Sequence, residues 1–174
     1  WEEKMITRIV ILLSLLVIVS AISLGQAGPK LPDEVRRCLE RDEFKGKVKI
    51  LTAQKTYLLR GDFDGDGVPD YALAIKGLKT RRNGVLICSS RGAAVMLGAE
   101  APKEPPFSDL PDDNFVAPSW QVMSKREANK LYNYEGDKPV KVASPKGDSI
   151  AMLWEDGTCL IYCDGTRYRW GCGQ

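Results

Sequence analysis

Four aspartates within nine residues are the strongest chemical feature of this sequence: Asp62, Asp64, Asp66 and Asp70. Carboxylates this close repel one another, and a turn between two apolar segments can be built with far less charge. A bound cation would remove the repulsion. A hard divalent ion takes about six to eight oxygens, which a tight loop supplies from alternate side chains and a backbone carbonyl. We therefore predict a metal site in this loop.

The spacing of the loop identifies the expected ligands. With Asp62 as the first position, the aspartates occupy positions one, three, five and nine, and Gly67 at position six permits a sharp reversal. The predicted metal ligands are Asp62, Asp64, Asp66, Asp70 and the backbone carbonyl of Val68. We expect Ca²⁺, because Mg²⁺ retains more water and requires a stricter octahedron. The alternative is an acidic solvated turn without metal.

The loop is not an EF-hand, because the bidentate glutamate expected at position twelve is Leu73. The D-x-D-x-D-G-x-x-D pattern instead resembles the calcium loop of FG-GAP and VCBS-type repeats, in which the loop joins two β-strands. The chain is also similar to small exported bacterial proteins that combine one such loop with an N-terminal helix and a C-terminal tryptophan-containing meander. The likeness covers about Thr56 to Ile75. Because the motif occurs once, it implies neither a propeller nor an adhesion role.

The segments around the loop have the patterns of short helices and strands. Helical spacing of apolar residues in 32–44, after two acidic residues, predicts a helix. A capping box from Ser124 to Glu127 predicts a second helix, with Ala128, Leu131 and Tyr132 on its buried side. Alternating or continuous apolar runs predict strands at 48–52, 56–59, 71–75, 85–88, 93–97 and 140–142. The proline-rich segment 101–118 predicts a surface loop.

Two aspartate–glycine pairs, at 156–157 and 164–165, predict tight hairpins near the C-terminus. These turns would pair Met152 with Ile161 on one side and Tyr168 with Ile161 on the other. One face of the resulting sheet would be apolar: Ile150, Met152, Trp154, Cys159, Ile161, Cys163, Tyr168 and Trp170. The predicted fold class is α+β, mostly antiparallel β-sheet with two short helices and a C-terminal three-stranded meander.

The N-terminal segment has the pattern of a secretory signal peptide. A basic start precedes the apolar run 9–22, which is followed by the small-x-small site Gly25-Gln26-Ala27. We predict a signal peptide at 1–27, with 1–4 as over-translated sequence, and a single globular calcium-loop domain at 28–174. The apolar run is shorter than the ~18 residues of a membrane anchor. The expected location is therefore periplasmic or extracellular, with no stable membrane span after cleavage.

Five cysteines in an exported chain predict one or two disulfides with at least one cysteine left over: Cys38, Cys88, Cys159, Cys163 and Cys172. Spacing leaves the connectivity open. Cys159 and Cys163 would lie roughly 13 Å apart on one strand, which is too far for a disulfide between them.

The composition limits the functional classes. The chain has no histidine, which excludes Ser-His-Asp and Cys-His catalysis on this chain. The net charge of +2 does not indicate nucleic-acid binding. With no recognisable catalytic constellation, we predict an exported, non-catalytic, calcium-binding module with a structural or binding role. Its partner would be an unknown protein or a cell-envelope polymer.

Two other functions stay open at this point. A carboxylate-dependent hydrolase of cell-envelope polymers would need a clustered acid pair such as Asp112-Asp113 or Glu155-Asp156. A secreted enzyme inhibitor would present a protruding loop such as 101–118. Basic groups near Arg81-Arg82 are interpreted as a solvated face rather than an anion site. A sugar-stacking platform of Trp120, Tyr132 and Tyr134 is a weaker hypothesis than core packing.

Overall fold

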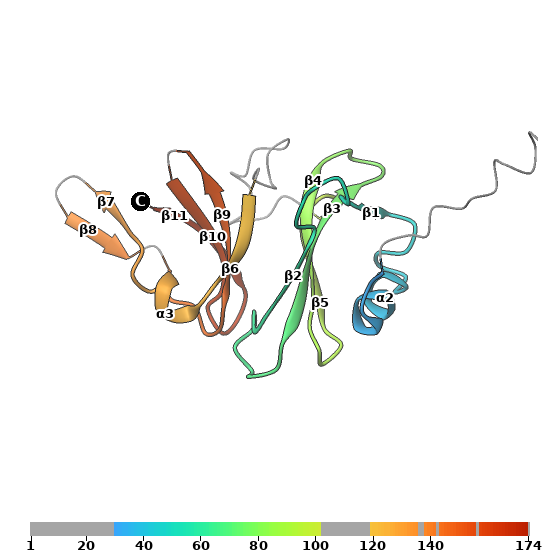
Figure 1. Ribbon diagram of the computed structural model, residues 1–174, viewed down its shortest axis with the longest axis horizontal. Coiled ribbons are helices and arrows are strands. Elements are labelled where there is room, and N and C mark those ends of the chain that lie inside the picture. Colours follow the sequence, from blue (N-terminus) through green and yellow to red (C-terminus); the bar gives the residue numbers. More distant parts are fainter. Residues whose placement is uncertain (1–29, 102–118, 136–137, 142, 156, 174) are drawn as a thin grey trace, which may run out of the picture. The chain divides into compact units, whose positions relative to one another are not determined.

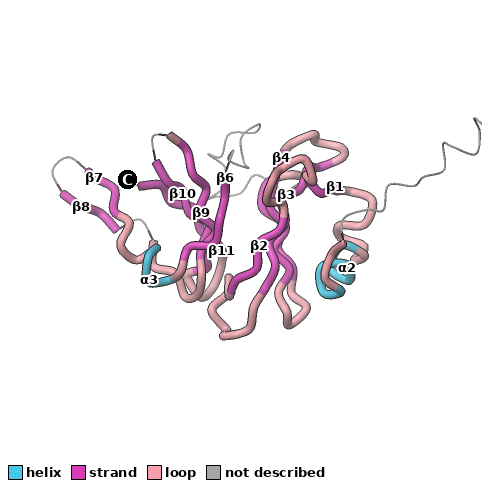
Figure 2. Tube along the Cα trace, viewed as in Figure 1, coloured by secondary structure: helices cyan, strands magenta, loops and turns pink. Residues whose placement is uncertain are grey.

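The computed structural model describes residues 30–101, 119–135, 138–141, 143–155 and 157–173. The predicted signal peptide and nearly all of the proline-rich segment lie outside the described residues, as does Asp156. Antiparallel strands dominate the described part, with two short helices (Figures 1 and 2). The predicted mostly antiparallel sheet is therefore confirmed. In the described ranges, no helix is both long enough and apolar enough to span a membrane.

The first sheet has five antiparallel strands: β1 (Val48–Ile50), β2 (Leu58–Gly61), β3 (Asp70–Gly77), β4 (Asn83–Cys88) and β5 (Ala94–Gly98). β3 is its centre, because β1 and β2 pair with successive parts of one edge of β3 and β4 pairs with the other. β3 is buried along most of its length, as expected for a strand that is covered on both faces. The aspartate loop joins β2 to β3, as predicted.

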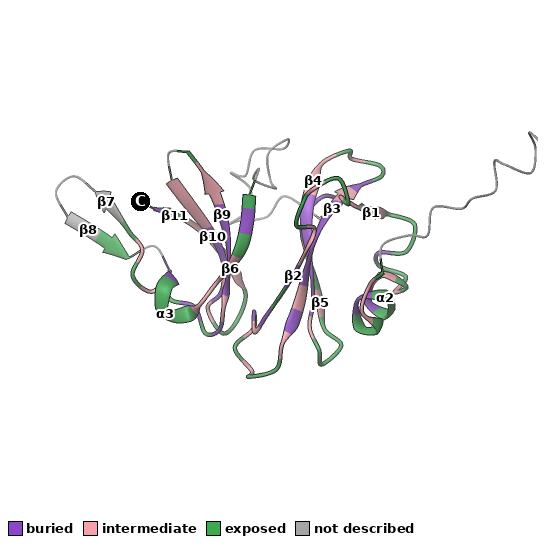
Figure 3. Ribbon diagram, in the orientation of Figure 1, coloured by how far each residue is buried: buried purple, intermediate pink, exposed green. Residues whose placement is uncertain are grey.

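Helix α2 (Asp33–Leu39) covers one face of this sheet and is shorter than the predicted 32–44. Its buried residues, Val35 and Cys38, pack against Leu73, Ile75 and Leu86 of the sheet, while its outer side is exposed (Figure 3). The disulfide between Cys38 and Cys88 joins the helix to β4. The predicted orientation of Cys38 towards the core is therefore confirmed.

The second sheet has the strand order β11-β10-β9-β6. It consists of β6 (Ser119–Met123), β9 (Ser149–Trp154), β10 (Gly157–Cys163) and β11 (Tyr168–Gly173). The predicted meander corresponds to β9, β10 and β11. β6 was not predicted, and the separate hairpin of β7 (Tyr132–Glu135) and β8 (Lys138–Lys141) was predicted only in its second strand.

The predicted register of the meander is wrong by two residues in both hairpins. Met152 pairs with Cys159 rather than Ile161, and Tyr168 pairs with Cys163 rather than Ile161. The second hairpin has a longer turn, in which the Asp164 carboxylate accepts hydrogen bonds from the backbone of residues 166 and 167. Because side chains alternate with a period of two, a shift of two leaves each residue on its predicted face. The apolar face is therefore confirmed.

The two sheets share one hydrophobic core. Leu59, Ala72 and Ile87 of the first sheet and Ile150, Met152 and Ile161 of the second belong to the same buried cluster. Trp120 is buried in this cluster, and its indole N–H donates to the carbonyl oxygen of Thr56. The described residues from Leu31 onward form one compact unit. Burial of Trp120 shows that it does not form an exposed sugar-stacking platform.

Helix α3 (Lys125–Ala128) begins at the predicted capping box. The Ser124 hydroxyl accepts the backbone N–H of Glu127, and the Glu127 carboxylate accepts the backbone N–H of Ser124. The Ser124 hydroxyl also donates to the Glu127 carboxylate, and this bond, followed by the one from the Ser124 N–H, lowers the pKa of Glu127. Ala128 packs against Ala151 and Leu160 on the second face of the meander. The predicted burial of Tyr132 is wrong, since the chain leaves the helix before it and Tyr132 starts β7 exposed.

We expect Ser124→Ala to lower the free energy of unfolding by about 1 kcal/mol, because it removes the side-chain cap of α3. Urea denaturation followed by circular dichroism measures the change. Lys125→Ala, at an exposed position of the same helix, is the control and should change stability by less than about 0.5 kcal/mol. Equal effects of the two substitutions would contradict the role of the cap.

Candidate metal centre

The aspartate loop reverses the chain between Gly61, which ends β2, and Asp70, which begins β3. Gly65 and Gly67 adopt positive φ angles of 80° and 87°, in the left-handed region that favours glycine. A Cβ atom on Gly65 would also lie 2.6 Å from the carbonyl carbon of Lys146. The glycines therefore allow both the reversal of the loop and its close contact with a neighbouring segment.

Three of the four aspartates converge. Asp62, Asp64 and Asp70 each place a carboxylate oxygen within 4.8 Å of the others. Asp70 is fully buried at the start of the central strand, whereas Asp62 and Asp64 are half-buried in the loop. Convergent carboxylate oxygens at this separation form a group that could hold a metal ion.

Backbone N–H groups hold the Asp70 carboxylate in place. One oxygen accepts hydrogen bonds from the N–H groups of Phe63 and Asp64, at 3.0 and 3.3 Å. The other oxygen accepts the N–H of Ser90 at 3.0 Å. Burial nevertheless raises the pKa of Asp70, and the negative charge of Asp64 raises it further against the effect of these hydrogen bonds. A cation at this position would offset the electrostatic penalty.

The other two members of the group are oriented by the loop itself. Asp62 accepts the N–H groups of Gly65 and Asp66 on one oxygen, at 2.9 and 3.0 Å, and that of Gly67 on the other, at 3.0 Å. Asp64 accepts the N–H of Asp66 at 3.1 Å. These bonds balance part of the negative charge and fix both carboxylates before any ligand binds.

Asp66 lies outside this convergent group. One of its oxygens is 2.5 Å from Nε of Arg91, and the other accepts the N–H of Val68 at 2.7 Å. Val68 is exposed at the tip of the loop, with a relative exposure of 41%. Ligation by Asp66 and by the Val68 carbonyl remains a prediction.

The turn between β4 and β5 contacts three aspartates, a proximity that the sequence does not predict. The Ser89 hydroxyl donates to Asp64 at 3.2 Å, the Ser90 N–H donates to Asp70, and Arg91 pairs with Asp66. Antiparallel pairing explains the proximity, because Tyr71 lies opposite Cys88 and the residues after β4 therefore lie beside those before β3. No local pattern around these three residues indicates the contact.

The segment that leads into the second sheet also contacts the loop. Asp62 and Asp148 exchange two hydrogen bonds, from the Asp148 N–H to the Asp62 carbonyl at 2.6 Å and from the Asp62 N–H to the Asp148 carboxylate at 3.1 Å. A Cβ atom on Gly147 would lie 2.0 Å from the Asp62 carbonyl oxygen, so only glycine fits. The aspartate loop is therefore anchored to both sheets.

The other carboxylate pairs offer no comparable group in the described part of the chain. Asp112, Asp113 and Asp156 lie outside it, and Glu155 is exposed at a hairpin. Asp164, which lies in the second hairpin turn, forms an ion pair with Arg169 at 2.5 Å. Cys163 is the free cysteine of the described residues; it is buried, and the remaining cysteines form the disulfides Cys38–Cys88 and Cys159–Cys172.

Comparisons with models of known protein families, with curated proteins and with solved structures found no match. The resemblance of the aspartate loop to FG-GAP and VCBS-type repeats therefore remains a prediction. The two disulfides indicate an oxidising setting outside the cytoplasm.

Proposed function

We propose that the protein is an exported, non-catalytic module that binds one Ca²⁺ ion in the loop between β2 and β3. The convergence of Asp62, Asp64 and Asp70 carries this proposal. Oxygen-only ligands favour a hard cation, and a loop of alternating carboxylates suits the flexible coordination of Ca²⁺ better than the strict octahedron of Mg²⁺. Asp66 and the Val68 carbonyl would complete the site if Asp66 turned away from Arg91.

The proposed role of the ion is structural. The loop contacts the β4–β5 turn on one side and the segment 146–148 on the other. Relief of the repulsion among Asp62, Asp64 and Asp70 would stabilise the loop and, through its contact with the segment 146–148, the packing of the two sheets. Extracellular modules bind Ca²⁺ with dissociation constants of about 10⁻⁴ to 10⁻³ M, which suits the export indicated by the disulfides and the N-terminal sequence. The resulting rigid surface would bind the partner, a protein or a cell-envelope polymer.

Ca²⁺ is expected to raise the melting temperature of the disulfide-bonded protein until the site saturates. The gain equals RT ln(1 + [L]/Kd), about 1 to 3 kcal/mol at plausible saturation. Asp64→Asn should abolish the gain, because it removes one charge from the convergent group while its amide oxygen can still accept the Asp66 N–H. Thermal unfolding across a Ca²⁺ titration, with Mg²⁺ in parallel, measures the effect.

Asp42→Asn is the matched control, since Asp42 is exposed and remote in sequence from the loop. This variant should keep the full response to Ca²⁺. If the wild-type protein shows neither a Ca²⁺-dependent shift of its melting temperature nor a heat of binding in calorimetry, the loop is an acidic turn without a metal site.

A further inference from the structure

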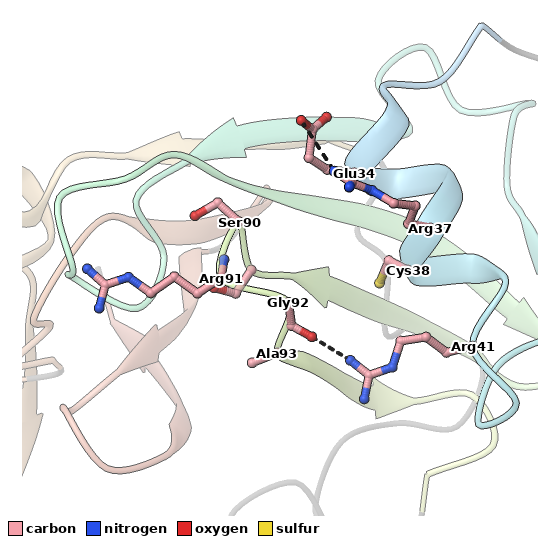
Figure 4. Close-up of a pocket in the computed structure, with 9 residues that line it drawn as sticks. Glu34, Arg37, Cys38, Arg41, Ser90, Arg91, Gly92 and Ala93 are labelled. Atoms are coloured by element: carbon pink, nitrogen blue, oxygen red, sulfur yellow. Dashed lines mark hydrogen bonds and ion pairs between the residues drawn. The ribbon is translucent and has the colours of Figure 1, made fainter.

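A cavity of about 380 Å³ lies between α2 and the turn that joins β4 to β5 (Figure 4). Its charged lining consists of three arginines and one glutamate: Arg37, Arg41, Arg91 and Glu34. The Arg91 guanidinium is paired with Asp66, so the remaining charged groups leave one positive charge in excess. Ser89 and Ser90 of the turn add hydroxyl groups. A cavity of this size and charge fits a small anionic ligand.

The two arginines on the helical side are partly engaged. Arg41 donates from Nη1 to the carbonyl oxygen of Gly92 at 2.7 Å, across the cavity, and its Nη2 lies 3.0 Å from Glu43. Arg37 lies 3.9 Å from Glu34, beyond hydrogen-bond distance. Each guanidinium carries five N–H donors in a planar fork, so these contacts leave donors for a ligand.

The walls of the cavity are held together covalently. Cys38 lies on the helical wall and its disulfide partner Cys88 immediately precedes the turn. The hydrogen bond from Arg41 to Gly92 spans the same two walls (Figure 4). A site with fixed walls loses little conformational entropy when a ligand binds.

Arg91 links this cavity to the aspartate loop. Figure 4 shows its side chain extending away from the helix, and its Nε pairs with Asp66. Asp66 is also a predicted ligand of the metal. If Asp66 turned to the ion, Arg91 would lose its carboxylate partner, and its guanidinium would be free to turn back to an anion in the cavity that the residue lines.

We propose that this cavity binds a phosphate monoester, and that binding tightens when the aspartate loop is occupied by its cation. Arginine forks suit the tetrahedral oxygens of a phosphate dianion, to which they donate pairs of charge-assisted hydrogen bonds. Arg37 and Arg41 provide the basal site, and Arg91 adds a third guanidinium in the metal-bound protein. The tightening by the cation rests on the proposed calcium binding, whereas the binding of a phosphate monoester does not.

The test is calorimetric titration of the disulfide-bonded protein with glycerol phosphate, in EDTA and again in saturating Ca²⁺. We expect binding in EDTA, at least about tenfold weaker in Arg37→Gln and Arg41→Gln, and about tenfold tighter for wild type in Ca²⁺. Arg91→Gln should keep the affinity seen in EDTA and lose the gain in Ca²⁺. Arg126→Gln, on the exposed side of α3, is the control and should behave as wild type.

Each failure has a distinct reading. No binding of glycerol phosphate in either condition would overturn the cavity as an anion site, even if Ca²⁺ raises the melting temperature. An affinity that does not change in Ca²⁺, in a protein that Ca²⁺ does stabilise, would overturn the link through Arg91. Binding to phosphatidic acid vesicles without binding of glycerol phosphate would assign the surface to a membrane and overturn the small-ligand proposal.

Discussion

Replacing Asp70 by alanine is expected to lower the free energy of unfolding by about 3 to 5 kcal/mol in the absence of calcium. Alanine leaves the N–H groups of Phe63, Asp64 and Ser90 without their acceptor. An unsatisfied buried donor costs about 1 to 3 kcal/mol, and backbone donors cannot be removed by the substitution. The substitution also removes a carboxylate that is buried beside Asp64, and this change favours the variant. It replaces none of the three hydrogen bonds, however.

Urea denaturation in EDTA measures this change without any contribution from a bound ion. Asp70→Asn should lower the free energy of unfolding by about half as much. Its amide oxygen still accepts N–H groups in place of one carboxylate oxygen, whereas its amide nitrogen, in place of the other, faces donors. Asp42→Ala, at an exposed position, is the control and should stay within about 0.5 kcal/mol of wild type. A loss below 1 kcal/mol in Asp70→Ala would show that the loop does not depend on this carboxylate.

Removing the disulfide between Cys38 and Cys88 is expected to destabilise the protein by about 4 kcal/mol, the value for a cross-link of this span. The two cysteines are 50 residues apart, so their link restricts the unfolded chain strongly. Both are buried, and the bond fastens α2 to the first sheet. Loss of the bond would therefore also loosen the packing of Val35 against Leu73, Ile75 and Leu86 of the first sheet.

The matched comparison is the disulfide between Cys159 and Cys172, which spans 13 residues and joins two strands already paired by hydrogen bonds. We expect its removal to cost about 3 kcal/mol or less. Both pairs are replaced by alanine in a Cys163→Ala background, which prevents thiol exchange. Chemical denaturation compares the two variants. A larger loss for the shorter link would contradict the predicted order.

The Cys38–Cys88 disulfide that holds α2 in place also holds the walls of the cavity beside it. One wall carries Arg37 and Arg41, and the disulfide holds this wall against the β4–β5 turn. The β4–β5 turn also contacts the aspartate loop, through Ser89, Ser90 and Arg91. The proposed cation site and the proposed anion site are therefore separated by three consecutive residues, which provide a short physical connection between them.

Local patterns predicted most of the secondary structure. The capping box at Ser124 formed, because its bonds involve only the first turn of its own helix. The strands on both sides of the aspartate loop formed because each carries a short apolar run and because the loop carries glycine where φ is positive. The first helix ended at Leu39 rather than at Phe44, since the residues after it form turns that lead into β1.

The hairpins show where local patterns reach their limit. In the second hairpin the aspartate–glycine pair predicted a two-residue turn, but the Asp164 side chain binds the backbone of Thr166 and Arg167 and supports a longer turn. The register moved by two while the buried face stayed the same, because the alternation of side chains constrains the face and not the pairing. The pairing of Cys159 with Cys172 followed from the register that the structure adopts.

By itself, the sequence determined the acidic loop, its place between two strands, the buried face of the meander and the exclusion of histidine chemistry. Each of these depends on residue types and on spacings within one segment. Only the tertiary structure decided which aspartates converge, that Arg91 forms an ion pair with Asp66, and that Asp148 and Gly147 contact Asp62. The contacts of Arg91, Gly147 and Asp148 join segments 25 to 86 residues apart, and they arise from strand pairing and sheet packing, which no local pattern specifies.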